Sequence, residues 1–96
     1  MTLYIDDREK SIFCELIKKK AKKMNIKTKI NRIEVGDYVI GDVCFEAKST
    51  ADFMVSLFSK RLWTQLDNMD RCFDLNFVVI YGSIEEACEI GTHMKG

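Results

Sequence analysis

The feature that most restricts the fold of this chain is a two-residue glycine–aspartate step between two β-rich runs. Residues 35–40 (Val-Gly-Asp-Tyr-Val-Ile) precede Gly41 and Asp42, and residues 43–48 (Val-Cys-Phe-Glu-Ala-Lys) follow them. Glycine at the first position of a two-residue loop suits a type II′ turn, whose twist matches that of paired antiparallel strands. The sequence therefore predicts a β-hairpin in which each residue of one run has a defined partner in the other.

This register places two acidic residues face to face on the hairpin. Asp37 lies opposite Glu46 with Cβ atoms about 5 Å apart, and Lys48 projects to the same face because side chains alternate along a strand. Like charges directly across a strand pair destabilise a sheet. The pair is therefore either a solvated surface pair neutralised by Lys48 or the site of a divalent cation, since Mg²⁺ prefers carboxylate oxygens.

The rest of the chain alternates between strand and helix patterns. In chain order these patterns predict a strand at 3–5, a helix at 11–24, a half-buried strand at 26–34, the hairpin, helices at 51–58 and 60–73, a strand at 76–81 and a short helix from 82. The order β-α-β-β-β-α-α-β-α predicts an α/β fold.

Details of these elements are also predicted. Asp6 or Asp7 is expected to cap the first helix, and Ser49-Thr50 the second. The apolar run at 76–81 is typical of a strand buried on both faces. The last helix is expected to turn three side chains inward, those of Ile84, Ala87 and Cys88.

Composition narrows the class of protein. With 96 residues the chain is long enough for a single domain spanning 1–96, and residues 91–96 read as a loose tail. No apolar run is long enough for a membrane span, and the first residues do not resemble a secretory leader. The four cysteines have neither zinc-site nor disulfide-framework spacing, which favours reduced thiols. We therefore expect a cytoplasmic or nuclear (nucleoid) protein and not a secreted or membrane protein.

The zero net charge conceals a strongly basic segment. Residues 17–32 contain eight lysine or arginine residues and no acidic residue. Lys18, Lys19 and Lys20 are either part of a solvated helix face or contacts to the phosphates of DNA. Charge alone favours the solvated face.

Three motifs occur in a characteristic order, at residues 5–9 (Ile-Asp-Asp-Arg-Glu), 36–37 (Gly-Asp) and 46–52 (Glu-Ala-Lys-Ser-Thr-Ala-Asp). They resemble the motifs Asp-x-Arg-Glu, Gly-Asp and Glu-Arg-Lys-x-x-x-Asp of the XPF–Hef family of structure-specific DNA endonucleases, over nearly the whole chain. The resemblance implies the PD-(D/E)xK nuclease fold, a restriction-endonuclease-like three-layer sandwich with a central mixed sheet and flanking helices.

The resemblance also implies roles for particular residues. Asp37 and Glu46 would bind a catalytic Mg²⁺ or Mn²⁺, together with the backbone carbonyl of Ala47, and Lys48 would orient the attacking water. Asp6 would add a carboxylate from the end of the first strand. The remaining matches would be supporting residues (Arg8, Glu9 and Asp52) and phosphate contacts from one helix face (Arg61 and Gln65), although ion pairing and a solvated face are their alternative roles.

Two departures from the family pattern open a second interpretation. Ala47 stands where the family has arginine, and the segment after Tyr81 is shorter than the family's strand and helix that pair subunits. The expected function is a metal-dependent endonuclease acting on branched, flap or fork DNA in repair or recombination, as a homodimer or with a partner subunit. The alternative is a catalytically impaired scaffold that binds DNA or a partner subunit.

Overall fold

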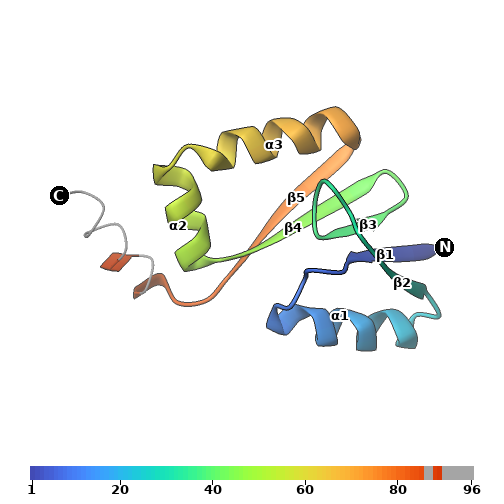
Figure 1. The fold of residues 1–96 in the computed structure, drawn as a ribbon. Helices are drawn as coiled ribbons and strands as arrows, with labels where there is room; N and C mark the ends of the chain where they lie inside the picture. Colours follow the sequence, from blue (N-terminus) through green and yellow to red (C-terminus); the bar gives the residue numbers. More distant parts are fainter. Residues whose placement is uncertain (86–87, 90–96) are drawn as a thin grey trace.

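The computed structural model describes residues 1–85 and 88–89 of the chain. Figure 1 shows its strands and helices in chain order. Their bounds are β1 (Thr2–Asp6), α1 (Ile12–Lys23), β2 (Lys27–Asn31), β3 (Tyr38–Ile40), β4 (Val43–Ser49), α2 (Thr50–Phe58), α3 (Arg61–Cys72) and β5 (Leu75–Tyr81).

The strands form one mixed sheet in the order β2-β1-β3-β4-β5. The outer pairs, β1 with β2 and β4 with β5, are parallel, whereas β3 runs antiparallel to both β1 and β4. Each parallel pair is joined by a helical crossover. The predicted central mixed sheet is therefore confirmed.

The two crossovers place helices on opposite faces of the sheet. Crossovers between parallel strands are almost always right-handed, and β1 and β4 run in the same direction while their partners lie on opposite sides of them. Helix α1 consequently covers one face, and α2 and α3 cover the other (Figure 1). This arrangement is the predicted α/β sandwich of three layers.

The core beneath α1 is built by alternate residues of the central strands. Leu3 and Ile5 of β1 and Tyr38 of β3 are buried against Cys14 and Ala21 of α1. Helix α1 begins after Ser11, its N-cap residue. Neither Asp6 nor Asp7 caps it as predicted, because five residues (7–11) separate β1 from the helix. The second helix begins as expected, since the Ser49 hydroxyl accepts a hydrogen bond of 3.0 Å from the Asp52 N–H.

The hairpin has the predicted register. Tyr38 lies opposite Phe45 and Ile40 opposite Val43. Gly41 takes a φ of 57°, the positive value that a type II′ turn requires at its first loop position.

Strand β5 is not buried on both faces as predicted. It lies at the edge of the sheet, so that Leu75 and Phe77 are half exposed. Strand β2, expected to be half buried, forms the other edge and is exposed at all five positions.

Some of the residues predicted to form the last helix lie in the part of the chain that the structure describes. Ile84 and Cys88 are exposed rather than turned inward. Ala87 and the predicted tail at 91–96 lie outside the described residues. Of the other cysteines, Cys14 and Cys44 are buried and Cys72 is exposed. No described helix has both the length and the apolar character needed to cross a bilayer.

Candidate active site

A polar cleft of about 590 Å³ opens beside the end of β1 and the start of β3, between the turn that precedes α1 and helices α2 and α3. Seven residues that the sequence predicted for the site line this cleft: Asp6, Arg8, Glu9, Asp37, Glu46, Asp52 and Gln65. They come from β1 and its following turn, the start of β3, the middle of β4, and helices α2 and α3. The fold therefore gathers into one space residues that are up to 59 positions apart in the sequence.

The alternation of β4 explains why Glu46 faces the cleft. Phe45 and Ala47 pack against the core beneath α1, so Glu46 and Lys48 must project from the opposite face. The backbone N–H of Ala47 donates a hydrogen bond of 2.8 Å to Asp37 Oδ2. This bond fixes the Asp37 carboxylate across from Glu46, as the register predicted.

The two carboxyl groups perturb each other. Burial raises the pKa of Glu46 to about 8, and the hydrogen bond with Asp37 and the negative charge of Asp37 contribute in the same direction. Burial also raises the pKa of Asp37, although hydrogen bonds from Glu46 and from the Ala47 N–H oppose this rise. Glu46 Oε2 is buried with no hydrogen-bond partner. The pair is thus costly to ionise together unless a cation lies between the two groups.

The Lys48 side chain is buried beneath α2 and does not line the cleft. Its ammonium donates a hydrogen bond of 3.3 Å to the hydroxyl of Ser56, which also accepts one of 3.3 Å from the Arg61 guanidinium. The positive charge of Lys48 lowers the pKa of Glu46 against the stronger effects that raise it. Ser56, fully buried, joins the two cations, a role that was not predicted from the sequence.

Both carboxylate oxygens of Asp6 accept hydrogen bonds from neighbouring groups. Its Oδ1 accepts a hydrogen bond of 2.8 Å from the Ile33 N–H, and its Oδ2 accepts one of 3.0 Å from Arg8 Nε. Burial raises the pKa of Asp6, but these hydrogen bonds and the charge of Arg8 outweigh it, and the net pKa is lowered. Because Arg8 also donates to the Ile33 carbonyl at 2.7 Å, the two side chains hold the loop that leads to Asp37.

Gly36 lets this loop pass close to β4. Its φ is +87°, and a Cβ atom at this position would overlap the Cys44 Sγ. Only glycine combines this backbone angle with so close an approach. Gly36 belongs to the Gly-Asp motif, but the motif alone does not reveal this steric reason.

Glu9 supports the wall of the cleft nearest α1. Its Oε1 accepts a hydrogen bond of 3.0 Å from the Ser11 N–H, while Oε2 is buried without a partner. Burial raises the pKa of the neighbouring Tyr38, and the negative charge of Glu9 contributes in the same direction. Glu9 is therefore held between the core and the cleft.

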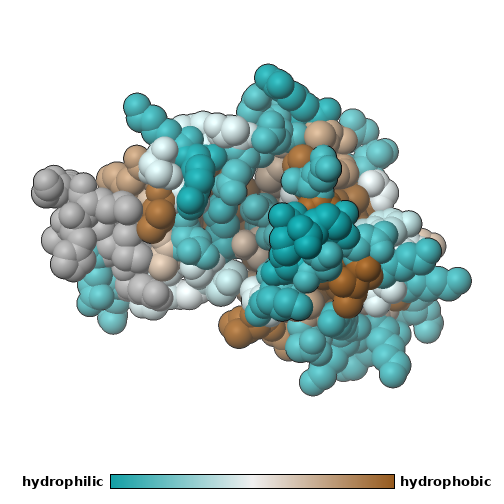
Figure 2. All heavy atoms as spheres, viewed as in Figure 1, coloured by the Kyte–Doolittle hydropathy of each residue, from teal (hydrophilic) through white to brown (hydrophobic). Residues whose placement is uncertain are grey.

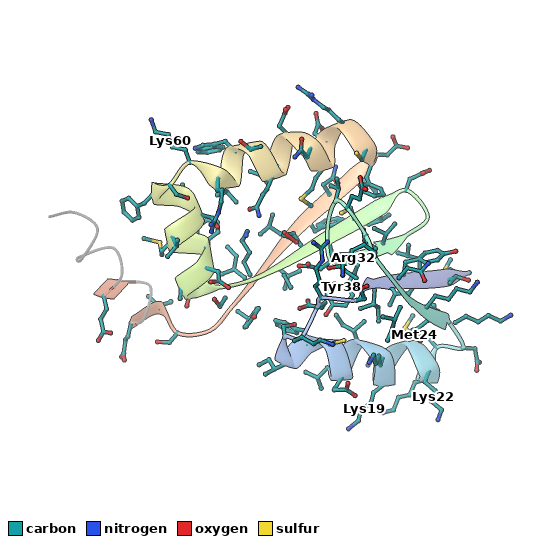
Figure 3. The ribbon with its side chains drawn as sticks, in the orientation of Figure 1. Lys19, Lys22, Met24, Arg32, Tyr38 and Lys60 are labelled. Carbon is teal, nitrogen blue, oxygen red and sulfur yellow. The ribbon has the colours of Figure 1, made fainter. Side chains whose placement is uncertain are left out.

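The predicted DNA-contacting lysines of α1 are not brought to the cleft. Helix α1 covers the other face of the sheet, and Figure 3 shows Lys19 on the side of the helix that points away from the sheet. Lys18 pairs with Glu15 at 3.5 Å, and Lys20 lines an apolar hollow beneath the helix.

The donor set fits a hard divalent cation. No group of three or more His, Cys, Asp or Glu side chains in the described part of the chain is arranged to hold a metal. Mg²⁺, however, commonly binds through one or two carboxylates and keeps its remaining positions for water and phosphate oxygens. Asp37 and Glu46 supply these two carboxylates, and the buried Glu46 Oε2 without a partner is the atom that a cation would satisfy.

A mixed five-stranded sheet that presents Asp37, Glu46 and Lys48 on one face of a hairpin has the architecture of the PD-(D/E)xK nuclease fold. The ERCC4 domain matches residues 5–93 of this sequence. The chain therefore belongs to the ERCC4 domain family of XPF-type endonucleases, as its motifs indicated.

Two relatives are similar in sequence. The chain is 33% identical over 90 residues to the 3′-flap repair endonuclease Xpf of Saccharolobus solfataricus, a match that covers 92% of this chain and 37% of that protein. It is 44% identical over 43 residues to the DNA repair endonuclease XPF of Dictyostelium discoideum, covering 44% of this chain and 4% of that one. The chain thus spans less than half the length of these relatives.

Two solved structures have the same fold. XPF from Aeropyrum pernix superposes with a TM-score of 0.73 at 21% identity, covering 99% of this chain and 47% of that one. The same protein in complex with DNA gives a TM-score of 0.69, also at 21% identity, covering 98% of this chain and 49% of that one.

Proposed function

We propose that this chain is a metal-dependent endonuclease that hydrolyses phosphodiester bonds in branched DNA, such as flaps and forks, during repair or recombination. The observation that carries the proposal is the buried Asp37–Glu46 pair, whose mutual repulsion a divalent cation would relieve. The names of the relatives support a flap substrate and a role in DNA repair. A chain with this role acts in the cytoplasm or nucleus, where chromosomal DNA lies.

Some residues of the cleft would hold the cation, and others would bind the phosphate or position the cation ligands. Asp37 and Glu46 would hold Mg²⁺ or Mn²⁺, which when bound polarises the phosphodiester and lowers the pKa of a water molecule. Lys48 keeps a positive charge beneath Glu46 and favours its ionised form. Gln65, from α3, is placed in the cleft where it can donate to a phosphate oxygen. Asp6 and Arg8 hold the loop that positions Asp37.

The test is cleavage of labelled flap, fork and single-stranded DNA in the presence of Mn²⁺. We expect cleavage by the wild-type chain, and a loss of at least about a thousandfold in D37N, because removing a metal ligand costs several kcal/mol of transition-state stabilisation. Cleavage by D37N at a rate within tenfold of wild type would contradict the proposal. A panel of substrates identifies the preferred junction in the same experiment.

Ala47 supports the second candidate function, a scaffold with impaired catalysis. Its methyl group packs on the α1 side of β4, so an arginine here would not contact the cation directly. Glu9 Oε2, buried without a partner, lies in the wall of the same cleft and would accept a guanidinium. We expect A47R to raise the cleavage rate. If neither the wild-type chain nor A47R cleaves any DNA, while both bind it, the scaffold function replaces the enzymatic one.

The exposed apolar edge near α1 supports pairing with a second copy of the chain. Phe77 stacks on Phe45 with ring centroids 5.3 Å apart, yet remains 48% exposed. Val79 lies beside it at the rim of an apolar hollow of about 370 Å³ between α1 and the sheet. We expect wild type to sediment as a dimer and F77K to sediment as a monomer. A wild-type chain that stays monomeric at millimolar concentration would contradict self-association.

A further inference from the structure

One face of the sheet bears Asp37 and Glu46. On this face, no described helix packs over the half that is built by β1 and β2. On this side of the sheet α2 packs against β4 and β5, and α3 packs against β5. Figure 1 shows both helices over the β4–β5 half, away from β2. The strand at this open edge is basic in sequence (Lys-Thr-Lys-Ile-Asn), and all five of its residues are exposed.

The strand register decides which side chains lie on the open surface. Ile5 of β1 is buried beneath α1 and pairs with Ile30, so that Ile30 faces α1. Side chains alternate along a strand. Lys27 and Lys29 therefore project from the other face, the one that bears Asp37 and Glu46.

The same register connects the lysines with the cleft. Asn31 pairs with Asp6, and continuing the β1–β3 and β3–β4 registers by one residue brings Asp37 and Glu46 into the same row across the sheet. Lys29 stands two rows away, two residues before Asn31 and on the same face. Three strand spacings separate β2 from β4, about 14 Å. Lys27 and Lys29 thus lie beside the cleft and not in it.

The acidic residues of the cleft indicate that DNA would need a basic surface outside it. Six acidic residues line the cleft against only two basic ones, Arg8 and Lys10 (the acids are Asp6, Glu9, Glu34, Asp37, Glu46 and Asp52). Even with a divalent cation bound, such a cleft repels the neighbouring phosphates of a DNA strand. A DNA strand that entered this cleft would therefore need cations outside it.

The two arginines near the open surface are already neutralised. Arg32 pairs with Asp7 at 2.8 Å, and Arg8 pairs with Asp6 at 3.0 Å. Lys27 and Lys29 have no ion-pair partner within the part of the chain that the structure describes. Their charges are available to an external anion. Figure 2 shows hydrophilic residues over most of the viewed surface at this end of the molecule.

We infer that Lys27 and Lys29, on the open face of β2, bind the phosphate backbone of the DNA arm that leads into the cleft. This inference rests on the proposed endonuclease function, since it names the surface that holds the substrate of the same site. It also replaces the lysines of α1 as DNA contacts, because α1 lies on the far side of the sheet. The ligand is the phosphodiester backbone, so the contact carries no base preference.

The test compares two pairs of lysines with equal charge. We would measure the binding of a labelled forked DNA, in EDTA and over a range of salt concentrations, to the wild-type chain, to K27Q/K29Q and to K19Q/K22Q. Figure 3 shows Lys19 and Lys22 on the outer side of α1, so this control removes the same charge from the other face. Circular dichroism checks that each variant is folded.

We expect K27Q/K29Q to reduce the slope of log K against log salt by about 2, because each phosphate contact contributes about 0.9 to the slope in B-DNA. The slope of K19Q/K22Q should stay at the wild-type value. Equal reductions in both variants, an unchanged slope in K27Q/K29Q, or no DNA binding by the wild-type chain would overturn the inference. Cleavage is assayed separately in Mn²⁺, so a chain that binds through β2 but cuts no DNA would refute only the endonuclease function.

Discussion

The two faces of the sheet are built by alternate residues of the same strands, yet they differ in almost every physical property. In β3 and the residue before it, Tyr38 is buried in an apolar core beneath α1, whereas Asp37 faces a polar cleft. In β4 the same division separates Phe45 from Glu46. The α1 face is packed and apolar, and its exposed part is suited to another protein surface. The opposite face holds buried ionisable groups and, farther along, exposed lysines.

This difference shows where the chain gains stability and where it loses it. Burying apolar side chains stabilises the α1 face. The Asp37–Glu46 pair instead carries an electrostatic cost, which the raised pKa of Glu46 reflects. Costs of this kind are concentrated at functional sites. Substitutions on the two faces should therefore differ in their effects on stability and on metal binding.

The largest expected effect concerns the core of the α1 face. I5A should lower the free energy of unfolding by about 3 kcal/mol, because Ile5 is 1% exposed and its truncation leaves a cavity. Ile30, its partner across β1 and β2, is 55% exposed, so I30A is the matched control and should cost less than about 1 kcal/mol. Urea denaturation measures both values. Equal losses would mean that the core does not lie where the structure places it.

An intermediate effect is expected where the face that bears Asp37 and Glu46 depends on a glycine. G36A should cost about 2 kcal/mol, because the new Cβ overlaps the Cys44 Sγ at a positive φ. It should also weaken Mn²⁺ binding, since Asp37 is the next residue. G41A is the control: Gly41 also has a positive φ, but a Cβ there meets nothing within 4 Å, and the turn is remote from the cation. If G36A bound Mn²⁺ as tightly as G41A, the metal site would not depend on Gly36.

The sequence was sufficient for the hairpin and the carboxylate pair, because a two-residue loop leaves a single register and strand alternation then determines the faces. It was not sufficient for β5. An apolar run indicates a strand but not whether that strand is central or at an edge, which depends on the order of the strands in the sheet. The role of Ser56 could not be predicted either, because it depends on α2 bringing the hydroxyl to Lys48 and Arg61, a contact that has no sequence pattern.

A further effect is expected in the pH dependence of the metal-free protein. The pKa of Glu46 is raised in the folded state from an ordinary value of 4.5 to about 8, so the folded chain keeps a proton that the unfolded chain has released. Stability from this group is complete below pH 4.5 and is lost as the pH rises toward 8. We expect the free energy of unfolding in EDTA to be lower at pH 8 than at pH 5.5. E46Q should remove most of this decrease, and Mg²⁺ should reduce it, since the cation binds the ionised pair. An increase in stability over this range would contradict the burial of the pair.

The most direct test of the central claim, that Asp37 and Glu46 jointly hold one divalent cation, is a Mn²⁺ titration followed by electron paramagnetic resonance. The account predicts one site per chain in the wild type, loss of this site in both D37N and E46Q, and retention of the site in K27Q/K29Q. If the wild type binds no Mn²⁺, or if either single variant binds it as well as the wild type, then these two carboxylates do not form the metal site.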